Sequence, residues 1–180
     1  MLLYNGCVVL NKSVKLNCGD VKHIGITLPK LIVKCKPNCT IYVDSEHVGM
    51  TPIGLYIAPG EHCIKFVYGN TSFSQIIVVK LNETKVIEIV LPKLIVNSTP
   101  SCEVYVDNRL IGKTPIELYV TPSEHSIKIV YNGCTVSYAS MWLNYSDVKH
   151  INITLPKIIV KSKLSCKVYV DNKYVGTTPV

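Results

Sequence analysis

Histidine and aspartate are the side chains of this chain that could act together as acids, bases or partners of a nucleophile. They return at regular positions instead of standing alone. The recurring sets are His62 with His125, His23 with His150, and Asp44 with Asp107 and Asp171. A residue that returns in every unit of a repeat usually serves the fold, so we interpret these as turn and strand residues. No other Ser-His-Asp set and no glycine-rich phosphate loop stands out, so we predict a protein that is not an enzyme and has no cofactor.

The eight cysteines suggest packing more than chemistry. Two positions repeat and three cysteines do not: the sets are Cys39, Cys102 and Cys166; Cys7 and Cys134; and the unrepeated Cys18, Cys35 and Cys63. A buried free cysteine packs as a small hydrophobic residue, so free thiols are the expectation. Two alternatives remain open, namely a disulfide such as Cys35–Cys63 and a zinc site formed by Cys35, Cys39 and a histidine such as His47. Because Cys-x-x-x-Cys without a second pair is a weak zinc signal, we predict no metal.

Asn-x-Ser/Thr sequons give the strongest site signal. They occur at Asn11, Asn38, Asn70, Asn82, Asn97, Asn144 and Asn152. We read Asn82 and Asn144 as sharing a Leu-Asn turn before a strand, and we expect Asn152 to face solvent. Glycosylation of such turns requires a secretory context. The alternative is that a β protein rich in asparagine, serine and threonine accumulates sequons, which its repeats then copy.

Aromatic residues were considered as a ligand-binding surface. Eight of the eleven tyrosines fall at three repeated positions, which is typical of half-buried sheet faces. Trp142 is the only tryptophan, and we align it with Lys15 and Lys80, which predicts a solvent-facing position. Trp142 is therefore the possible contact residue of a binding surface.

Three motifs recur in register along the chain. Leu-Pro-Lys begins at Leu28, Leu91 and Leu155; Tyr-Val-Asp begins at Tyr42, Tyr105 and Tyr169; Thr-Pro begins at Thr51, Thr114 and Thr178. Each series steps by 63 and then 64 residues. A fixed period of this length indicates tandem modules. We expect whole modules at 29–91 and 92–155, the C-terminal half of a module at 1–28, and the N-terminal half of one at 156–180.

Composition and turn signals predict an all-β fold. Hydrophobic residues make up 48% and charged residues 17%, which is too apolar for disorder. In the second whole module, short alternating segments are separated by turn residues such as Asn132-Gly133, the strongest hairpin signal. The net charge of +7 is scattered, so we predict no nucleic-acid partner. No apolar run reaches the roughly 18 residues of a membrane span. The predicted fold is a tandem array of small β-sandwich modules of about 63 residues.

These motifs resemble the PEGA-domain family. The residues that carry the resemblance are Pro100 through Asn108, Gly112-Lys113-Thr114-Pro115, Pro59-Gly60-Glu61-His62 and Pro122-Ser123-Glu124-His125. The sequence departs from the family where Ser45, Asn108 and Asn172 replace glycine, although asparagine tolerates the left-handed backbone needed there. The resemblance implies a compact β-sandwich, without shared catalytic residues, in surface-layer or other envelope proteins.

We therefore expect a structural spacer segment of a cell-surface protein, outside the cell or in its envelope, with its targeting signal outside this chain. The alternative is a carbohydrate- or protein-binding module of an envelope protein. The expected partners are neighbouring modules of the same or a like chain, and possibly envelope glycan. The two half modules lack partner strands, so they either fray, dock on the whole modules or pair between chains. We expect them to be less protected from exchange than the whole modules.

Overall fold

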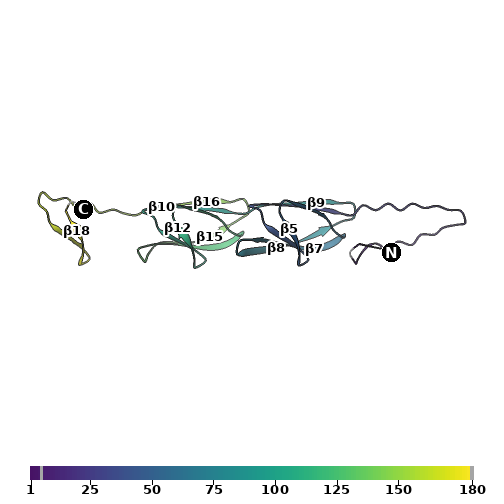
Figure 1. Cartoon of the computed structure of the whole chain (residues 1–180), viewed down its shortest axis with the longest axis horizontal. Helices are drawn as coiled ribbons and strands as arrows, with labels where there is room; N and C mark the ends of the chain where they lie inside the picture. Colours follow the sequence, from purple (N-terminus) through teal and green to yellow (C-terminus); the bar gives the residue numbers. More distant parts are fainter. Residues whose placement is uncertain (5, 179–180) are drawn as a thin grey trace.

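The computed structural model describes residues 1–4 and 6–178. All regular secondary structure assigned in these residues is β-strand, which confirms the predicted all-β fold class. Two complete units lie end to end along the long axis of the molecule, and the chain ends extend beyond them on opposite sides (Figure 1). Asn5 and Pro179, which belong to the repeated motifs, lie outside the described residues.

The first module comprises residues 30–90 and has two sheets. Its strands are β3 (Lys30–Lys36), β4 (Thr40–Val43), β5 (Glu46–Met50), β6 (Ile53–Tyr56), β7 (Gly60–Tyr68), β8 (Thr71–Val79) and β9 (Thr84–Val90). One sheet has the order β6-β3-β9 and the other has the order β5-β4-β7-β8. The first and last strands, β3 and β9, are parallel neighbours, so the beginning and the end of the module pair within one sheet.

The second module comprises residues 93–154 and has the same strand order. Its strands are β10 (Lys93–Thr99), β11 (Glu103–Val106), β12 (Arg109–Lys113), β13 (Ile116–Tyr119), β14 (Ser123–Tyr131), β15 (Cys134–Leu143) and β16 (Val148–Thr154). The sheets are β13-β10-β16 and β12-β11-β14-β15, and β10 and β16 are parallel. The two modules therefore have equivalent topologies, strand by strand.

Each module has its own hydrophobic core between its two sheets. Alternation along a strand sends every second side chain inward, as in β3, where Leu31 and Val33 are completely buried. Phe66 on β7 fills the first core, and Leu94 and Val104 fill the second. The period-2 pattern of the sequence thus determines which face of each strand is buried.

Asparagine, aspartate and glycine close the hairpins by adopting left-handed backbone angles. Asp107 and Asn108 have φ of 49° and 63°, and Asn132 and Gly133 have φ of 48° and 79°. Two successive residues with positive φ match the right-handed twist of the flanking strands, which explains the turn residues found at these positions.

A β-bulge accounts for the unequal period. In β14–β15, Ile129 pairs with Ser137 and Val130 pairs with Thr135, so Val136 is an extra residue. The corresponding pair β7–β8 has an uninterrupted register. Val136 therefore makes the second period one residue longer than the first.

The end segments contain only short hairpins. Strands β1 (Leu2–Tyr4) and β2 (Cys7–Leu10) form one two-stranded sheet, and β17 (Lys167–Val170) and β18 (Lys173–Thr177) form another. No strand is assigned at residues 11–29, which run out from the hairpin and back to β3 (Figure 1). β1–β2 repeats the bulged register of β14–β15, because Leu2 pairs with Leu10 and Leu3 pairs with Val8. The β1–β2 hairpin therefore corresponds to the end of β14 and the start of β15 in the second module.

Candidate functional site

Each whole module buries one histidine against the aspartate of its first hairpin. In the second module, Nδ1 of His125 lies 2.7 Å from a carboxylate oxygen of Asp107, and Nε2 lies 2.8 Å from the carbonyl oxygen of Thr121. In the first module, the same bonds join His62 to Asp44 at 2.6 Å and to the carbonyl of Ala58 at 2.8 Å. Both histidines are buried, so each pair lies at the edge of the hydrophobic core of its module.

The charge state of the pair follows from its hydrogen bonds. Burial raises the pKa of Asp107, but the hydrogen bonds from His125 and from the backbone N–H of Ser126 lower it, and the net pKa lies below the usual 3.8. The pKa of Asp44 is lowered in the same way by His62 and the N–H of Cys63. Both partners of each ring, an ionised carboxylate and a carbonyl oxygen, are hydrogen-bond acceptors.

Ser123 adds a third member to this network in the second module. Its hydroxyl lies 3.0 Å from Nε2 of His125, which gives a Ser-His-Asp chain of hydrogen bonds. A catalytic histidine must accept the serine proton at this nitrogen. A carbonyl oxygen can only accept, so the 2.8 Å contact between Nε2 and the carbonyl of Thr121 fits a ring that donates from this nitrogen. The arrangement suits holding the β13–β14 loop to the Asp107 hairpin.

Sequence reasoning assigned these histidines a structural role but missed their aspartate partners. The signal was present, because Asp44 and His62 are separated by 18 residues and so are Asp107 and His125. Asp171 has the same turn, with φ of 48°.

Two cysteines of the first module form a disulfide, which corrects the expectation of free thiols. Cys35 and Cys39 are bonded across the β3–β4 loop, whereas Cys63, the suggested partner of Cys35, is free and exposed. The suggested zinc site is therefore not formed by these residues. Within residues 1–4 and 6–178, no three histidine, cysteine, aspartate or glutamate side chains are placed to hold a metal ion.

The tryptophan and one sequon lie together on the outside of the second module. Trp142 on β15 is 65% exposed, and its indole N–H donates to the side-chain oxygen of Asn144 at 3.0 Å. Tyr138, on the same strand and face, is 62% exposed. The two aromatic side chains therefore extend from one surface, although their role in binding remains a prediction.

The strand registers correct the sequence alignment around Trp142. Glu124 pairs with Trp142 and Glu61 pairs with Val78, so the counterpart of Trp142 is Val78 and not Lys80. Val78 is also exposed, because this face of the outer strand points to solvent in both modules. The Val136 bulge accounts for one residue of this two-residue difference.

Asn82 and Asn144 also occupy different positions of their turns. The turn residue with positive φ is Asn82 in the first module and Ser146 in the second, with φ of 62° and 67°. Asn144 begins its turn, where its N–H binds the carboxylate of Asp147 at 2.7 Å, as the N–H of Lys80 binds Glu83. The idea that Asn82 and Asn144 share one turn position was wrong, although both side chains are exposed.

The other sequon asparagines differ in their accessibility. Asn11 and Asn38 are exposed. Asn97 and Asn152 face each other across the parallel strands, and the amide of Asn97 donates to the oxygen of Asn152 at 3.0 Å. Asn70 lies at the junction of the modules, where its side-chain oxygen accepts from the Arg109 guanidinium at 2.8 and 2.9 Å.

The junction between the two modules is a specific contact. Its members pair a residue of the first module with one of the second: Tyr68 with Tyr119, Phe73 with Tyr145, and Asn70 with Arg109. The first two pairs have ring centroids 6.2 and 6.0 Å apart in edge-to-face geometry. Burial raises the pKa of the Tyr145 phenol, as expected for a ring placed against the first module.

One backbone hydrogen bond of the junction occurs twice in the chain. The N–H of Ser146 donates to the carbonyl of Val90, at the end of the first module, at 2.8 Å. At the equivalent place one period earlier, the N–H of Asn82 donates to the carbonyl of Thr27 at 3.2 Å. The turn before the last strand of a module thus holds the end of the preceding unit.

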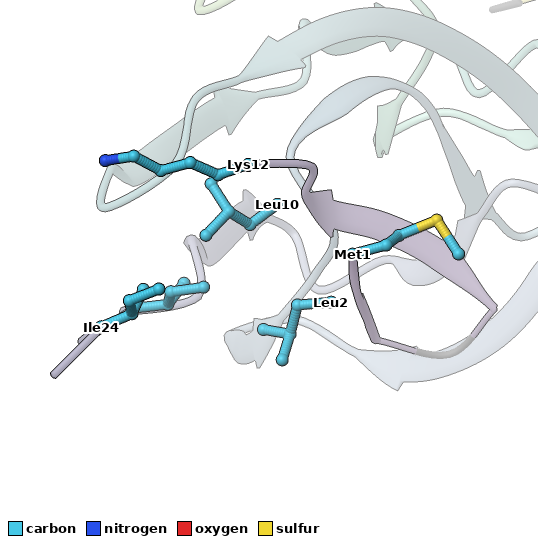
Figure 2. Close-up of a pocket in the computed structure, with 6 residues that line it drawn as sticks. Met1, Leu2, Leu10, Lys12 and Ile24 are labelled. Carbon is cyan, nitrogen blue, oxygen red and sulfur yellow. The ribbon is translucent and has the colours of Figure 1, made fainter. Parts of the chain in front are cut away.

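The N-terminal segment encloses an apolar hollow of about 410 Å³. Figure 2 shows Met1, Leu2, Leu10 and Ile24 around it, with the Lys12 amine directed away. Leu2 corresponds to Phe66, which is completely buried in the first core. The hollow therefore lies at the position that the hydrophobic core occupies in the first module.

Comparison with known proteins identifies the second module. Residues 91–159 match the family model described as PEGA domain. This segment is a PEGA domain. PEGA domains are non-enzymatic modules that are typical of extracellular and cell-envelope proteins. The family assignment from sequence is confirmed for the matched residues.

The other comparisons add little to this assignment. None of the curated proteins compared with the chain matches it. A solved structure titled "The Bacillus anthracis TIE protein" is similar at 12% identity and a TM-score of 0.27; the match covers 72% of this chain and 33% of that one. The chain therefore spans about a third of that structure. Within the described part of the chain, no helix has the length and hydrophobicity needed to cross a membrane.

Proposed function

We propose that the chain is a structural spacer segment of a cell-surface or envelope protein, in which PEGA-type modules are joined end to end without catalytic activity. The first module has the same topology as the PEGA domain of residues 91–159. We divide the chain into whole modules at 29–91 and 92–155, flanked by half modules at 1–28 and 156–180. The sequons agree with an extracellular location for such an array.

The junction is the observation that carries this proposal. Leu91 at the end of the first module is 1% exposed and belongs to the first core, against which Tyr119 of the second module packs, whereas its counterpart Leu155 is only partly buried. Modules joined by a flexible linker would not need edge-to-face aromatic pairs or a repeated backbone hydrogen bond between neighbours. Contacts of this kind fix the angle between modules and stabilise each through its neighbour, as in other repeat arrays.

A junction variant tests the spacer role. We expect Tyr119→Ser combined with Tyr145→Ser to loosen the two modules, which small-angle scattering and residual dipolar couplings would detect as a wider range of inter-module angles. Tyr138→Ser is the control, because it removes an exposed tyrosine away from the junction. Unchanged couplings in the double variant would contradict the spacer proposal.

The location needs a separate measurement in the native host. We expect the modules to be cleaved or labelled on intact cells by a protease or a membrane-impermeant reagent. Labelling that occurs only after cell lysis would contradict the envelope assignment while leaving the junction result untouched.

The exposed aromatic face supports a second candidate, a carbohydrate- or protein-binding module. Tyr138 and Trp142 extend from one face of β15, and the Lys128 amine on the neighbouring β14 lies 4.5 Å from the Tyr105 ring centre. Flat exposed rings stack on sugars or protein surfaces. Because Trp142 is the only tryptophan, its fluorescence reports directly on this face during titration with envelope oligosaccharides. No spectral change, or the same change in Tyr138→Ser, would count against this candidate.

A further inference from the structure

Eight strands form the edges of the four sheets in the two whole modules. They are β5, β6, β8 and β9 in the first module and β12, β13, β15 and β16 in the second. An edge strand has a row of backbone N–H and C=O groups without a partner strand, which natural proteins protect by shortness, charge, proline or a bulge. An edge that lacks all of these features is open to pairing with another chain.

Seven of the eight edges have at least one protective feature. β5, β6, β12 and β13 contain only four or five residues each. β9 contains Lys85 and Glu88, and β16 contains Lys149. β15 is long and uncharged, but the bulge at Val136 interrupts its register with β14.

β8 of the first module has none of these protections. Its nine residues, Thr71–Val79, include no charged residue and no proline, and its register with β7 is uninterrupted. Ile76 and Val78 extend from its outer face and are 66% and 56% exposed. The edge is therefore long, unbulged, uncharged and partly apolar, which is the combination that recruits another strand.

The sandwich is also open beside this edge. A groove of about 370 Å³ lies between β8 and β9, lined by Gln75, Ile77 and Ile87 among others. Gln75 is exposed although it lies on the inner face of β8, opposite the completely buried Ile64. An additional strand beside β8 would therefore cover the groove with its own inner-face side chains.

A second copy of β8 fits this edge. In antiparallel pairing about a two-fold axis, with Gln75 opposite Gln75 of the second copy, all nine residues of each strand are paired. Ser74 then lies opposite Ile76 of the second copy, and no like charges face each other because the strand has none. The two Gln75 amides meet on the axis, where each can donate to and accept from the other. A charged strand would find no opposite charge on β8, so the edge is matched best by itself.

The charged residues of the groove do not oppose this contact. They are Lys85 and Glu88 on β9. Lys85 is paired with Glu83, and Glu88 is paired with Lys34. The axis therefore brings together two grooves whose charges are already compensated within each copy.

We propose that the first module is a dimerisation site, at which β8 of one copy pairs antiparallel with β8 of a second copy. The sheet order β5-β4-β7-β8 then continues as β8-β7-β4-β5 in the second copy, which gives one sheet of eight strands. The contact is isologous, so it closes after two copies. β8 lies on the long side of the array (Figure 1), so the contact joins arrays side by side and is independent of the spacer role.

Sedimentation equilibrium of the full chain tests the proposal. The background for all variants has serine in place of the exposed free cysteines, which excludes association through disulfides: Cys7, Cys18, Cys63, Cys134 and Cys166. In about 0.5 M NaCl, which screens the net charge of +7, the mean mass should rise toward that of a dimer as the concentration approaches about 1 mM. A mass that stays at the monomer value up to about 1 mM would overturn the proposal.

A charge on the edge should prevent the pairing. We expect Ile76→Lys to raise the dissociation constant at least about tenfold, because it places a charge in the contact twice and removes apolar surface. Ser140→Lys is the matched control on the bulged edge: Ile76 pairs with Cys63, and Ser140 pairs with the equivalent residue Ser126. The control should associate as the background does. No loss in Ile76→Lys, or an equal loss in both variants, would overturn the proposal.

Disulfide trapping tests the register. Gln75→Cys in the same background places the two thiols opposite each other on the axis, and we expect diamide to oxidise them to a covalent dimer. Adding Ile76→Lys should abolish this cross-link. Ser72→Cys is the control, because Ser72 is exposed on the same strand but lies six residues, or about 20 Å, from its copy in this register. Equal cross-linking of the two cysteine variants, or cross-linking that survives Ile76→Lys, would overturn the proposal.

Discussion

Replacing Asp107 with asparagine should destabilise the second module by about 1 kcal/mol. The carboxylate accepts from His125 at 2.7 Å and from the backbone N–H of Ser126 at 2.9 Å. Hydrogen bonds to charged groups contribute about 1.5–3 kcal/mol each. The Asp107 side chain is 53% exposed, so solvent screening reduces that figure, and asparagine keeps one acceptor oxygen. Asparagine also tolerates the positive φ, so no backbone strain is added.

Urea unfolding followed by Trp142 fluorescence measures this loss, because the only tryptophan is in the second module. Asp171→Asn is the matched control: it makes the same change in the equivalent turn outside the second module, and its effect on the unfolding of that module should be under about 0.3 kcal/mol. In a module of this size, 1 kcal/mol corresponds to a shift of about 4–8 °C in Tm. Equal stability of Asp107→Asn and the wild type would refute the role of the buried pair.

The pH dependence gives a second measure of the same interaction. The folded pKa of Asp107 lies below its usual 3.8, so the carboxylate contributes stability that is fully present above that value. This contribution is lost as the pH falls through the folded pKa. The difference in stability between the wild type and Asp107→Asn should therefore shrink below about pH 4. A difference that grows on acidification would contradict the assignment.

Three further predictions concern the loop disulfide, the exposed face and the sequons. Cys35→Ser, which copies Ser98 of the second module, should cost at most about 2 kcal/mol by loop entropy, measured by urea unfolding under non-reducing conditions. Trp142→Ala should change thermal stability by less than about 0.5 kcal/mol because the side chain is mostly exposed, so any loss of ligand binding would be a surface effect. Asn82 and Asn144 should carry glycan in the native host because their side-chain nitrogens make no hydrogen bond among the described residues; glycopeptide mass spectrometry would show it, and bare peptides at both positions would contradict it.

The strands and hairpins could be predicted because their signals are local. Alternation predicted segments such as 116–120 and 126–130, which lie within or overlap β13 and β14. Turn residues with positive φ predicted the hairpins at Asp107-Asn108 and Asn132-Gly133. The parallel pairing of β10 with β16 was not predicted, because it joins segments about a module apart and no local pattern reports it.

The candidate site was harder to predict, and bulges and tertiary contacts explain why. An extra residue at Val136 shifts every later position by one, which accounts for one of the two residues between Val78, the counterpart of Trp142, and Lys80, the expected one. The Cys35–Cys39 bond is found in only one module, because Ser98 stands at the position of Cys35 in the other, so repetition gave no information about it. The Asp-His pairs recur at constant spacing. They were missed because each residue, taken separately, was interpreted as a turn or strand residue.

Repetition also hides which residues join the modules. Tyr68 and Tyr131 occupy the same position, and from the sequence both are half-buried strand residues. Only the structure shows that Tyr68 meets Tyr119 of the next module, whereas Tyr131 lines an open groove. A residue that stabilises its own module and one that binds the neighbour recur with equal regularity, so periodicity cannot separate them. The ends of the array can, because a position such as Leu91 or Leu155 changes its exposure only when the neighbour is responsible for its burial.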